Sequence, residues 1–112
     1  MYKRQYYRCD VSDKEEVKEL VQTIKKNYKK LDGIIHSAGV IEDNFIIKKT
    51  TEEIRTVLSP KIQGVKNLDE ATKDERLDFI ILFSSIASVM GNVGQCDYAS
   101  ANAYLDLSLI HI

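Results

Sequence analysis

The sequence has no tryptophan and is poor in proline and cysteine, with one proline and two cysteines among 112 residues. Cys9 and Cys96 lie far apart and form no Cys-x-x-Cys pair, so a disulfide framework is not expected. Sparse cysteine of this kind favours a reducing, cytoplasmic setting. Two histidines and two cysteines at unrelated positions match no zinc-binding pattern, and the sequence therefore predicts no metal site.

An excess of charge is missing as well, because 16 lysines and arginines stand against 17 aspartates and glutamates. No apolar run approaches the roughly 18 residues of a membrane span, and residues 1–10 lack the apolar centre of a signal peptide. We therefore expect neither nucleic acid nor a membrane as a partner. What is present is a hydrophobic content of 44%, enough for the core of one domain or part of one.

Strand-like and helix-like segments alternate along the chain, which predicts an α/β fold with a parallel sheet. We expect strands at residues 6–9, 31–37 and 78–84. The last of these is apolar on both faces, which is typical of a central strand with helices on either side.

Two of the expected helices begin with the pattern of a capping box, in which a hydroxyl and an acidic side chain satisfy free backbone amides. Ser12 with Glu15 forms the first pattern, and Thr50 with Glu53 forms the second. Pro60 should break or restart the second helix, because proline lacks the amide hydrogen that a helix interior needs.

Ligands bind outside the carboxyl ends of the strands in sheets of this kind. Three predicted strand ends carry polar or small residues: Asp10, then residues 36–39, then Ser84 and Ser85. The topology therefore places a candidate site at these strand ends but does not name its ligand.

Four residues near these strand ends form a candidate catalytic group: Tyr98, Ser85, Lys61 and Asn102. Asn102 lies one helical turn after Tyr98 and faces the same way. A phenol has a pKa of about 10 and is a poor proton donor at neutral pH unless a cation stabilises the phenolate. A lysine would supply that cation, and a serine hydroxyl would hold a carbonyl oxygen in line. The group suits protonation of an oxygen as hydride arrives at carbon.

Residues 82–106, which contain Ser85, Tyr98 and Asn102, resemble the catalytic stretch of ketoreductase domains of modular polyketide synthases. These domains belong to the short-chain dehydrogenase/reductase superfamily. Residues 36–40 resemble their His-x-Ala-Gly turn. Most free-standing members of the superfamily carry Tyr-x-x-x-Lys with an upstream asparagine. The reverse arrangement found here resembles the synthase ketoreductases in particular.

A further matching segment, residues 59–68, resembles the Pro-Lys-x-x-Gly helix start that contains the lysine of this family. The resemblance spans about residues 6–106 and implies a Rossmann-like, doubly wound parallel sheet. The sheet is expected to be incomplete, because the family's first strands, its Gly-rich turn and its C-terminal lid find no match. Residues 1–112 are thus expected to be one partial domain, the central and catalytic part.

The ends of the chain depart from the family pattern at residues 1–5 and 107–112, and we hypothesise that both are foreign to the natural protein. Without its first strands, the sheet would expose an edge and apolar helix faces would be uncovered. The isolated chain is therefore expected to be marginally stable or aggregation-prone and not to reduce ketones.

The resemblance also implies roles for the four residues. Tyr98 would donate a proton to the β-keto oxygen, and Ser85 would hydrogen-bond the same oxygen. Lys61 would stabilise the phenolate of Tyr98 and contact the nicotinamide ribose, while Asn102 would help the proton relay. The implied substrate is a β-ketoacyl thioester on an acyl carrier protein, with NADPH as reductant and neighbouring synthase domains as partners.

The cofactor contacts implied by the family fall near the strand ends. Asp10 and Val11 resemble the pair that contacts adenine, although Asp10 also fits a plain turn or cap residue. Ala38 and Gly39 would let the cofactor pass close to the backbone, and His36 fits a packing residue equally well. The full implied set is Asp10, Val11, His36, Ser37, Ala38, Gly39, Lys61 and Tyr98.

Asp43 is the implied stereochemical determinant, with Ser85 as the other substrate contact. Residues 41–43, Ile-Glu-Asp, stand where B-type ketoreductases carry Leu-Asp-Asp. Met90 stands where A-type domains carry tryptophan. The resemblance therefore favours a B-type domain that forms the D-alcohol, with a solvated loop acid as the alternative interpretation of Asp43.

Other functions stay open beside this one. The chain could be a catalytically silent, structural part of a ketoreductase, although such a part is not expected to hold all four residues. A free-standing reductase of fatty acids or sugars is disfavoured by the lysine–asparagine exchange. A flavodoxin-like or phosphoacceptor module would need an acidic cluster or a phosphate loop, and neither is present.

Overall fold

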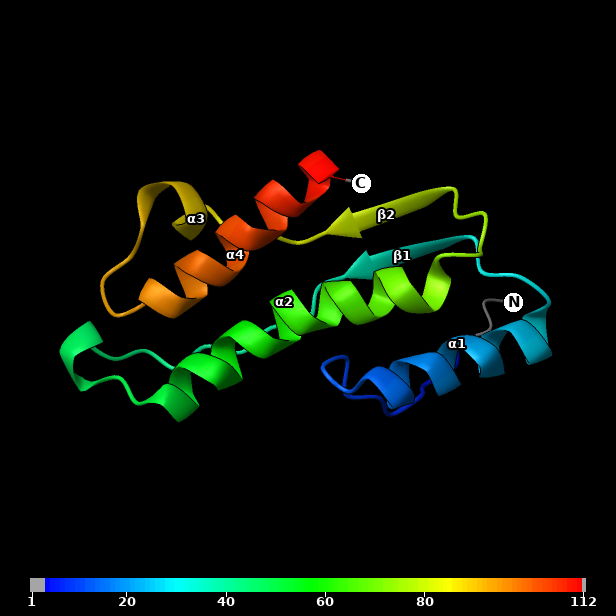
Figure 1. Cartoon of the computed structure of the whole chain (residues 1–112), viewed down its shortest axis with the longest axis horizontal. Coiled ribbons are helices and arrows are strands. Elements are labelled where there is room, and N and C mark those ends of the chain that lie inside the picture. Colours follow the sequence, from blue (N-terminus) through cyan, green and yellow to red (C-terminus); the bar gives the residue numbers. More distant parts are fainter. Residues whose placement is uncertain (1–3, 112) are drawn as a thin grey trace.

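The computed structural model describes residues 4–111, in which helices pack beside a short parallel sheet (Figure 1). Strands β1 (Gly33–His36) and β2 (Phe79–Leu82) pair in parallel, with Gly33 opposite Phe79 and His36 opposite Leu82. Parallel neighbours need a long crossover connection, and helix α2 (Thr51–Thr72) supplies it. The predicted α/β class with a parallel sheet is confirmed, and the described residues form two strands of that sheet.

The remaining elements are helical. They are α1 (Lys14–Tyr28), the 3-10 helix η1 (Ile46–Lys48), α3 (Ala87–Met90), α4 (Cys96–Ser108) and η2 (Leu109–His111).

The strand expected at residues 6–9 is absent, and this prediction was wrong. A strand exists only through ladder hydrogen bonds to a neighbour. The sheet of residues 4–111 consists of β1 and β2 alone, and the segment forms no ladder with either. Its side chains are mostly exposed, as Tyr6 illustrates with an exposed fraction of 88%.

The first helix begins at a different cap from the one expected. Asp13, rather than Ser12, precedes α1, and its carboxylate accepts the amides of Glu15 and Glu16 at 2.9 and 3.0 Å. An aspartate at this position also interacts favourably with the positive end of the helix dipole, which explains why it displaces the serine. The second capping box, Thr50 with Glu53, is confirmed.

Pro60 lies inside a continuous helix and does not interrupt it, contrary to the prediction. One backbone hydrogen bond is lost at this point because proline has no amide hydrogen. The neighbours of Pro60 on the inner face, Val57 and Lys61, are 1% and 4% exposed. Burial of apolar side chains of α2, such as Val57, offsets that loss and keeps the helix in one piece.

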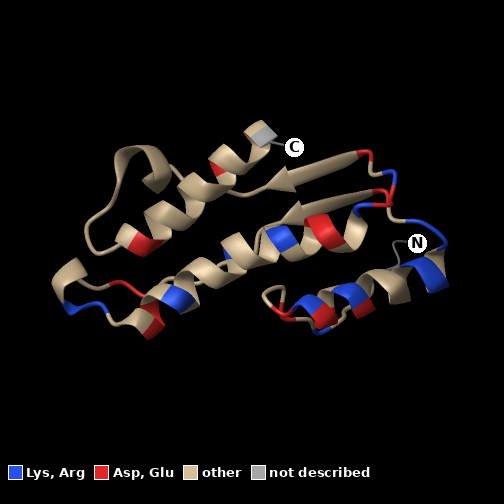
Figure 2. Ribbon diagram, viewed as in Figure 1, with Lys and Arg blue, Asp and Glu red and all other residues tan. Residues whose placement is uncertain are grey.

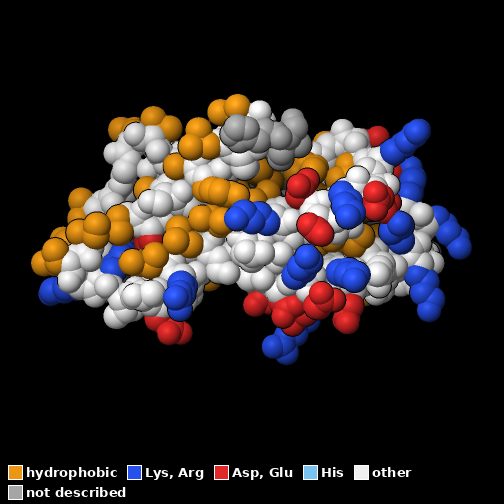
Figure 3. Space-filling view, in the orientation of Figure 1, with side chains coloured by type: hydrophobic (Ala, Val, Ile, Leu, Met, Phe, Trp, Pro, Cys, Tyr) orange, Lys and Arg blue, Asp and Glu red, His pale blue; other side chains and the backbone are white. Residues whose placement is uncertain are grey.

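The core lies where α2 contacts α4 and, further along, α1. Val57, Leu105 and Ala101 are buried between α2 and α4, and Val17 and Val21 of α1 are buried on its inner face. On the face shown in Figure 3, apolar side chains gather over α3, α4 and the segment around η1, whereas charged side chains gather over α1. Within residues 4–111, no helix combines the length and apolar character that crossing a membrane requires.

One face of the sheet is uncovered. Phe79, Ile81 and Phe83 are 46%, 44% and 54% exposed, so the expected burial of this strand on both faces is wrong for these residues. These side chains alternate along the strand with Ile80 and Leu82, which are half-buried, so one face of β2 is covered and the other is not.

Candidate active site

The candidate site lies at the carboxyl ends of β1 and β2, which meet at the same edge of the sheet. The amide of Phe83 donates to the carbonyl of His36 at 2.9 Å and extends the pairing one residue past β2. Beyond this point the two segments separate. One continues into residues 37–45, and the other continues into Ser84 and Ser85. Helices α2 and α4 pack against each other beside these strand ends (Figure 1).

Helix α2 buries the cationic residue of the site. Lys61 is 4% exposed, and its Nζ donates a hydrogen bond of 2.8 Å to the carbonyl oxygen of Phe83. Burial lowers the pKa of Lys61, because desolvation disfavours the ammonium. The Nζ lies 5.9 Å from the ring centroid of Tyr98. The structure therefore brings the predicted lysine and tyrosine together from different helices.

Helix α4 carries Tyr98 and Asn102 one turn apart. Asn102 is fully buried, and its Nδ2 donates to the backbone carbonyl of Tyr98 at 2.8 Å. The Oδ1 of Asn102 has no hydrogen-bond partner among residues 4–111. Ser84 adds a contact from the end of β2, since its Oγ donates to the carbonyl of Asn102 at 3.3 Å. The strand end and the helix are thus joined by a hydrogen bond beside the tyrosine.

Ser85 lies between β2 and α3. Its Oγ accepts the amide of Ala87 at 3.2 Å, and its carbonyl accepts the hydroxyl of Ser88 at 2.8 Å. These contacts fix the serine at the start of the short helix α3, which packs on α4. A hydroxyl that accepts a backbone amide keeps its own hydrogen available for donation.

His36 ends β1 and is 3% exposed. Burial lowers its pKa, and the nearby charge of Lys61 lowers it further. Its Nε2 has no hydrogen-bond partner among residues 4–111. A Cβ on Gly64 would approach within 3.1 Å of His36 and 3.0 Å of Val11, so glycine at this position lets α2 pack closely on both residues.

Val11 and Asp10 precede α1 and are held in a turn. The carbonyl of Val11 accepts the side-chain amide of Asn67 at 3.0 Å, which ties this turn to α2. The carboxylate of Asp10 accepts the amide of Ser12 at 2.9 Å, and its own amide donates to Glu16 at 2.7 Å. The aspartate therefore has a local turn-forming contact, and it remains exposed.

The residues that follow β1 lie nearer the surface. Ser37 and Gly39 are exposed, and Ala38 is half-buried. A Cβ on Gly39 would lie 3.2 Å from Cε of Lys61, so a side chain at this position would press against the lysine.

Asp43 lies beside the loop that precedes α4. The Nε2 of Gln95 donates to both carboxylate oxygens of Asp43, at 3.0 and 3.3 Å. The Oε1 of Gln95 accepts the side-chain amide of Asn92 at 3.0 Å. The amide of Asn44 donates to the carbonyl of Gly94 at 3.1 Å, which joins the same two segments.

Three polar residues of this region escaped the sequence reasoning: Gln95, Asp97 and Lys49. Gln95 is 9% exposed and orients Asp43, and Lys49 and Asp97 form an ion pair with an Nζ–Oδ2 distance of 2.9 Å. The position of Asp97 directly before Tyr98 was a local signal. Nothing in the local sequence indicated the pairing of Lys49 or Gln95 with a distant segment.

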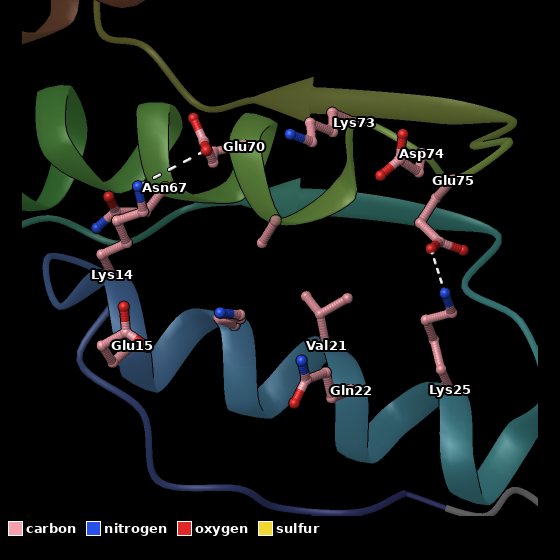
Figure 4. Close-up of a pocket in the computed structure, with 12 residues that line it drawn as sticks. Lys14, Glu15, Val21, Gln22, Lys25, Asn67, Glu70, Lys73, Asp74 and Glu75 are labelled. Atoms are coloured by element: carbon pink, nitrogen blue, oxygen red, sulfur yellow. Dashed lines mark hydrogen bonds and ion pairs between the residues drawn. The ribbon is translucent and has the colours of Figure 1, made fainter.

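A separate polar groove runs between α1 and α2 (Figure 4). It is crossed by the ion pairs Lys14–Glu70, at 3.6 Å, and Lys25–Glu75, at 2.5 Å. Both lysine side chains are about half exposed, and exposed pairs of this kind contribute little to stability or recognition. The groove holds none of the predicted site residues, and we place the candidate site at the strand ends.

Comparison with known proteins identifies the family of this chain. Two relatives are the polyketide synthases PksN and PksL of Bacillus subtilis (strain 168), which are 52% and 55% identical to this chain over 102 and 101 residues. These matches cover 91% and 90% of the chain, and the chain spans 2% of the length of each synthase.

Solved structures agree with these relatives. A ketoreductase from the macrolactin assembly line has a TM-score of 0.90 and 46% identity, covering 91% of this chain and 21% of its own. A ketoreductase domain from the bacillaene assembly line has a TM-score of 0.88 and 47% identity, covering 95% and 27%. A short chain dehydrogenase from Mycobacterium avium has a TM-score of 0.80 and 26% identity, covering 91% and 40%. The family model of the KR domain matches residues 2–111, and the chain therefore belongs to the family of ketoreductase (KR) domains of polyketide synthases.

Proposed function

We propose that this chain is the catalytic part of a ketoreductase domain that reduces a β-ketoacyl thioester to the β-hydroxyacyl thioester with NADPH. The substrate would be carried on an acyl carrier protein during polyketide synthesis. The observation that carries the proposal is the contact of buried Lys61 with the ring of Tyr98 at the strand ends, in a chain of the KR family.

The proposed mechanism assigns one task to each polar group. Tyr98 donates its phenolic proton to the β-keto oxygen, and Ser85 donates a hydrogen bond to the same oxygen. Lys61 stabilises the phenolate that forms, because its ammonium is held beside the ring in a buried setting. Asn102 orients the helix turn that carries Tyr98 and offers its free Oδ1 to the relay that restores the proton.

The residues present fit the nicotinamide end of such a cofactor, which would supply the hydride when bound. Lys61 has three donors and gives one of them to Phe83, so donors remain for a ribose hydroxyl. Gly39 leaves space beside the lysine that a side chain would fill. The buried, unpartnered Nε2 of His36 lies next to this turn and offers a further polar contact.

The remaining cofactor contacts would come from Ser37 and Ala38 after β1 and from Asp10 and Val11 before α1. Val11 shares the packing surface of Gly64 with His36, so the turn before α1 and the end of β1 are neighbours across α2. This proximity supports a position of the cofactor's adenine end near Val11. The pyrophosphate-binding, Gly-rich turn of such folds is not among residues 4–111.

Asp43 is proposed as the group that selects the face of the ketone, giving a B-type domain and the D-alcohol. Its two hydrogen bonds from Gln95 hold the carboxylate beside the loop that leads to Tyr98. Asp43 is exposed, and its contact with Gln95, which is 9% exposed, is what sets it apart from a freely solvated loop acid. This contact supports the stereochemical role over the plain alternative.

Neighbouring synthase domains are the proposed partners, together with the acyl carrier protein. PksN and PksL are polyketide synthases of which the chain spans 2%. The uncovered sheet face with Phe79, Ile81 and Phe83 is where the rest of the same ketoreductase domain would pack.

The test uses the complete ketoreductase domain that contains this chain, expressed from its parent gene. It is assayed with a β-ketoacyl N-acetylcysteamine thioester and with NADPH or NADH. Tyr98→Phe is expected to lower kcat by about 100-fold or more, because it removes the proton donor. Tyr104→Phe, on the same helix beside exposed Lys66, is the matched control and should change kcat by less than about twofold, since it keeps the ring and its cation–π contact and removes only a hydroxyl outside the proposed site.

Each outcome bears on a different part of the proposal. Loss of turnover in the Tyr98 variant alone would support the catalytic assignment, and chiral analysis of the alcohol would test Asp43. Faster turnover with NADH would contradict the choice of NADPH. A folded domain that binds NADPH but reduces no β-ketoacyl thioester would contradict the proposed reaction.

A further inference from the structure

Two charged side chains in the site region have no part in the chemistry proposed above. The side chains of Lys49 and Asp97 are 0% and 2% exposed, and Nζ lies 2.9 Å from Oδ2. The other ion pairs of residues 4–111 lie at the surface, with at least one partner more than two-fifths exposed. Charged groups are seldom buried without a specific contact that compensates for their desolvation. The position of this pair therefore calls for an explanation.

Asp97 belongs to α4, the helix that carries Tyr98. It lies in the first turn of α4, and its Oδ1 accepts the backbone amide of Tyr98 at 2.8 Å. One carboxylate oxygen thus holds the amide of the proposed proton donor, and the other faces Lys49. Negative charge is favourable in the first turn of a helix, which strengthens the contact with the amide.

Lys49 contacts the segment that carries Asp43. Its Nζ donates to the backbone carbonyl of Glu42, directly before Asp43. Its own backbone is fixed, because its amide donates to the carbonyls of Phe45 and Ile46 at the end of η1. The carboxylate of Asp97, held in an ion pair with Lys49, raises the pKa of Lys49, so the ammonium keeps its charge at neutral pH.

The two contacts together form a bridge. It runs from the carbonyl of Glu42 through Lys49 and Asp97 to the amide of Tyr98. A second connection joins the same segments, through Gln95 and Asp43. The segment with the stereochemical determinant and the helix with the proton donor are thus linked at two points.

We propose that Lys49 and Asp97 are positioning residues that fix Tyr98 relative to Asp43, and thereby set both the rate and the stereochemical outcome of ketoreduction. The inference rests on the proposed function of Tyr98 and Asp43. Displacement of a reacting group by about 1 Å can cost about 100-fold in rate, so a bridge of this kind has a measurable consequence.

A purely stabilising role is the main competing explanation. Removal of one partner of a buried ion pair leaves the other charge uncompensated, whereas removal of both charges together avoids that penalty. The double variant Lys49→Met with Asp97→Asn removes both charges. Its asparagine keeps an oxygen for the amide of Tyr98. This variant separates positioning from stability, even if either single variant fails to fold.

The experiment uses the complete ketoreductase domain and measures the ratio of the two alcohols, kcat, the Kd for NADPH and the melting temperature. The double variant is expected to melt near the unmutated domain and to bind NADPH equally well. Its kcat and its preference for one alcohol should each fall by about tenfold or more. The single variant Lys49→Arg keeps the positive charge. Its kcat and its preference for one alcohol should therefore lie between those of the double variant and those of the unmutated domain. Lys48→Met changes an exposed neighbour and should leave all four quantities unchanged.

Hydrogen exchange provides a readout that does not depend on turnover. Removal of the pair should accelerate exchange in peptides covering residues 40–47 and 95–100 together, while the Lys48 variant should not. A folded double variant with unmutated kcat, alcohol ratio and exchange would overturn the inference. If the unmutated domain reduced no substrate, the proposed function would fail. Exchange would then decide whether the bridge exists: unchanged exchange in the double variant would overturn it, and joint acceleration would support it.

Discussion

Helices α2 and α4 form two lysine–tyrosine contacts with nearly equal geometry and different surroundings. Lys61 lies 5.9 Å from the ring centroid of Tyr98, and Lys66 lies 5.7 Å from that of Tyr104. Lys61 is 4% exposed and donates to the carbonyl of Phe83, directly after β2, whereas Lys66 is exposed to solvent. A cation near a ring interacts more strongly when both are desolvated. The comparison shows that burial at the strand ends, rather than distance to the ring, distinguishes the proposed catalytic pair.

The same contrast extends to the two ends of the molecule. Charged residues of both signs lie along α1 and the adjoining end of α2, whereas few lie on α3 and α4 (Figure 2). The pairs of the charged end, such as Lys14–Glu70, are exposed and screened by solvent. At the strand ends, His36, Asn102 and Asp97 are nearly inaccessible. Polar groups buried at a desolvation cost mark the region where we expect chemistry.

Separate substitution of the two lysines, Lys61 and Lys66, is expected to give the largest difference in kcat. In the complete domain, Lys61→Met should lower kcat by about 100-fold or more, because the phenolate of Tyr98 loses its cation. Lys66→Met removes an exposed contact worth about 0.5–1 kcal/mol and should leave kcat nearly unchanged. Initial rates of NADPH oxidation with a β-ketoacyl thioester check both expectations.

Circular dichroism melts accompany the rates, so that unfolding of the Lys61 variant is not mistaken for lost chemistry. Equal, small effects of the two substitutions on kcat would contradict the importance of burial. A large effect of Lys66→Met would place the active group at the other end of the α2–α4 interface.

The candidate residues of the site were easier to infer from the sequence than the long-range contacts that position them. The spacing of Tyr98 and Asn102 on one helix, and the resemblance of the segment that contains Lys61 to a family motif, pointed to residues that the fold brings together. Their catalytic roles stay a prediction. The pairing of Lys49 with Asp97 depends on how the loop after β1 packs on the start of α4. Local patterns carry no information about such a long-range contact.

The fold errors have the same origin. Residues 6–9 have the composition of a strand, but strand formation depends on a neighbour with which to pair. The interruption expected at Pro60 was overruled by packing of α2 on α4, which a local rule does not include. The apolar sequence of β2 predicted its parallel pairing correctly, whereas its coverage depends on other parts of a fold.

Two buried asparagines provide a comparison within the buried region. Asn67 uses both ends of its amide, donating to Val11 at 3.0 Å and accepting from Gln63 at 2.9 Å. Asn102 leaves its Oδ1 without a partner among residues 4–111. Asn67→Leu should therefore lower the free energy of unfolding by about 1–3 kcal/mol, because the part-buried carbonyl of Val11 loses its donor.

Asn102→Leu should cost less stability than Asn67→Leu, because the carbonyl of Tyr98 that loses the Nδ2 donor keeps its helical amide partner, and an unpartnered buried acceptor disappears. Its kcat should nevertheless fall, since the proposed relay beside Tyr98 is lost. Urea unfolding followed by circular dichroism and rate measurements on both variants check the contrast. A loss of stability in the Asn102 variant as large as in the Asn67 variant would show that Oδ1 is satisfied in the folded domain.

The smallest expected effect is the pH dependence that buried His36 adds to stability. Burial and the charge of Lys61 lower the pKa of His36 in the folded state, whereas the unfolded chain keeps a value of about 6.5. Between these two values the unfolded state binds a proton that the folded state does not. Stability therefore falls as pH decreases below about 6.5 and is restored above it.

His36→Gln removes this contribution, and exposed carboxylates, which titrate in both proteins, cancel in the comparison. Urea unfolding at neutral and mildly acidic pH should show a smaller loss of stability in the variant. An equal loss in both proteins would mean that the histidine is solvated, and that the buried polar region does not extend to the end of β1.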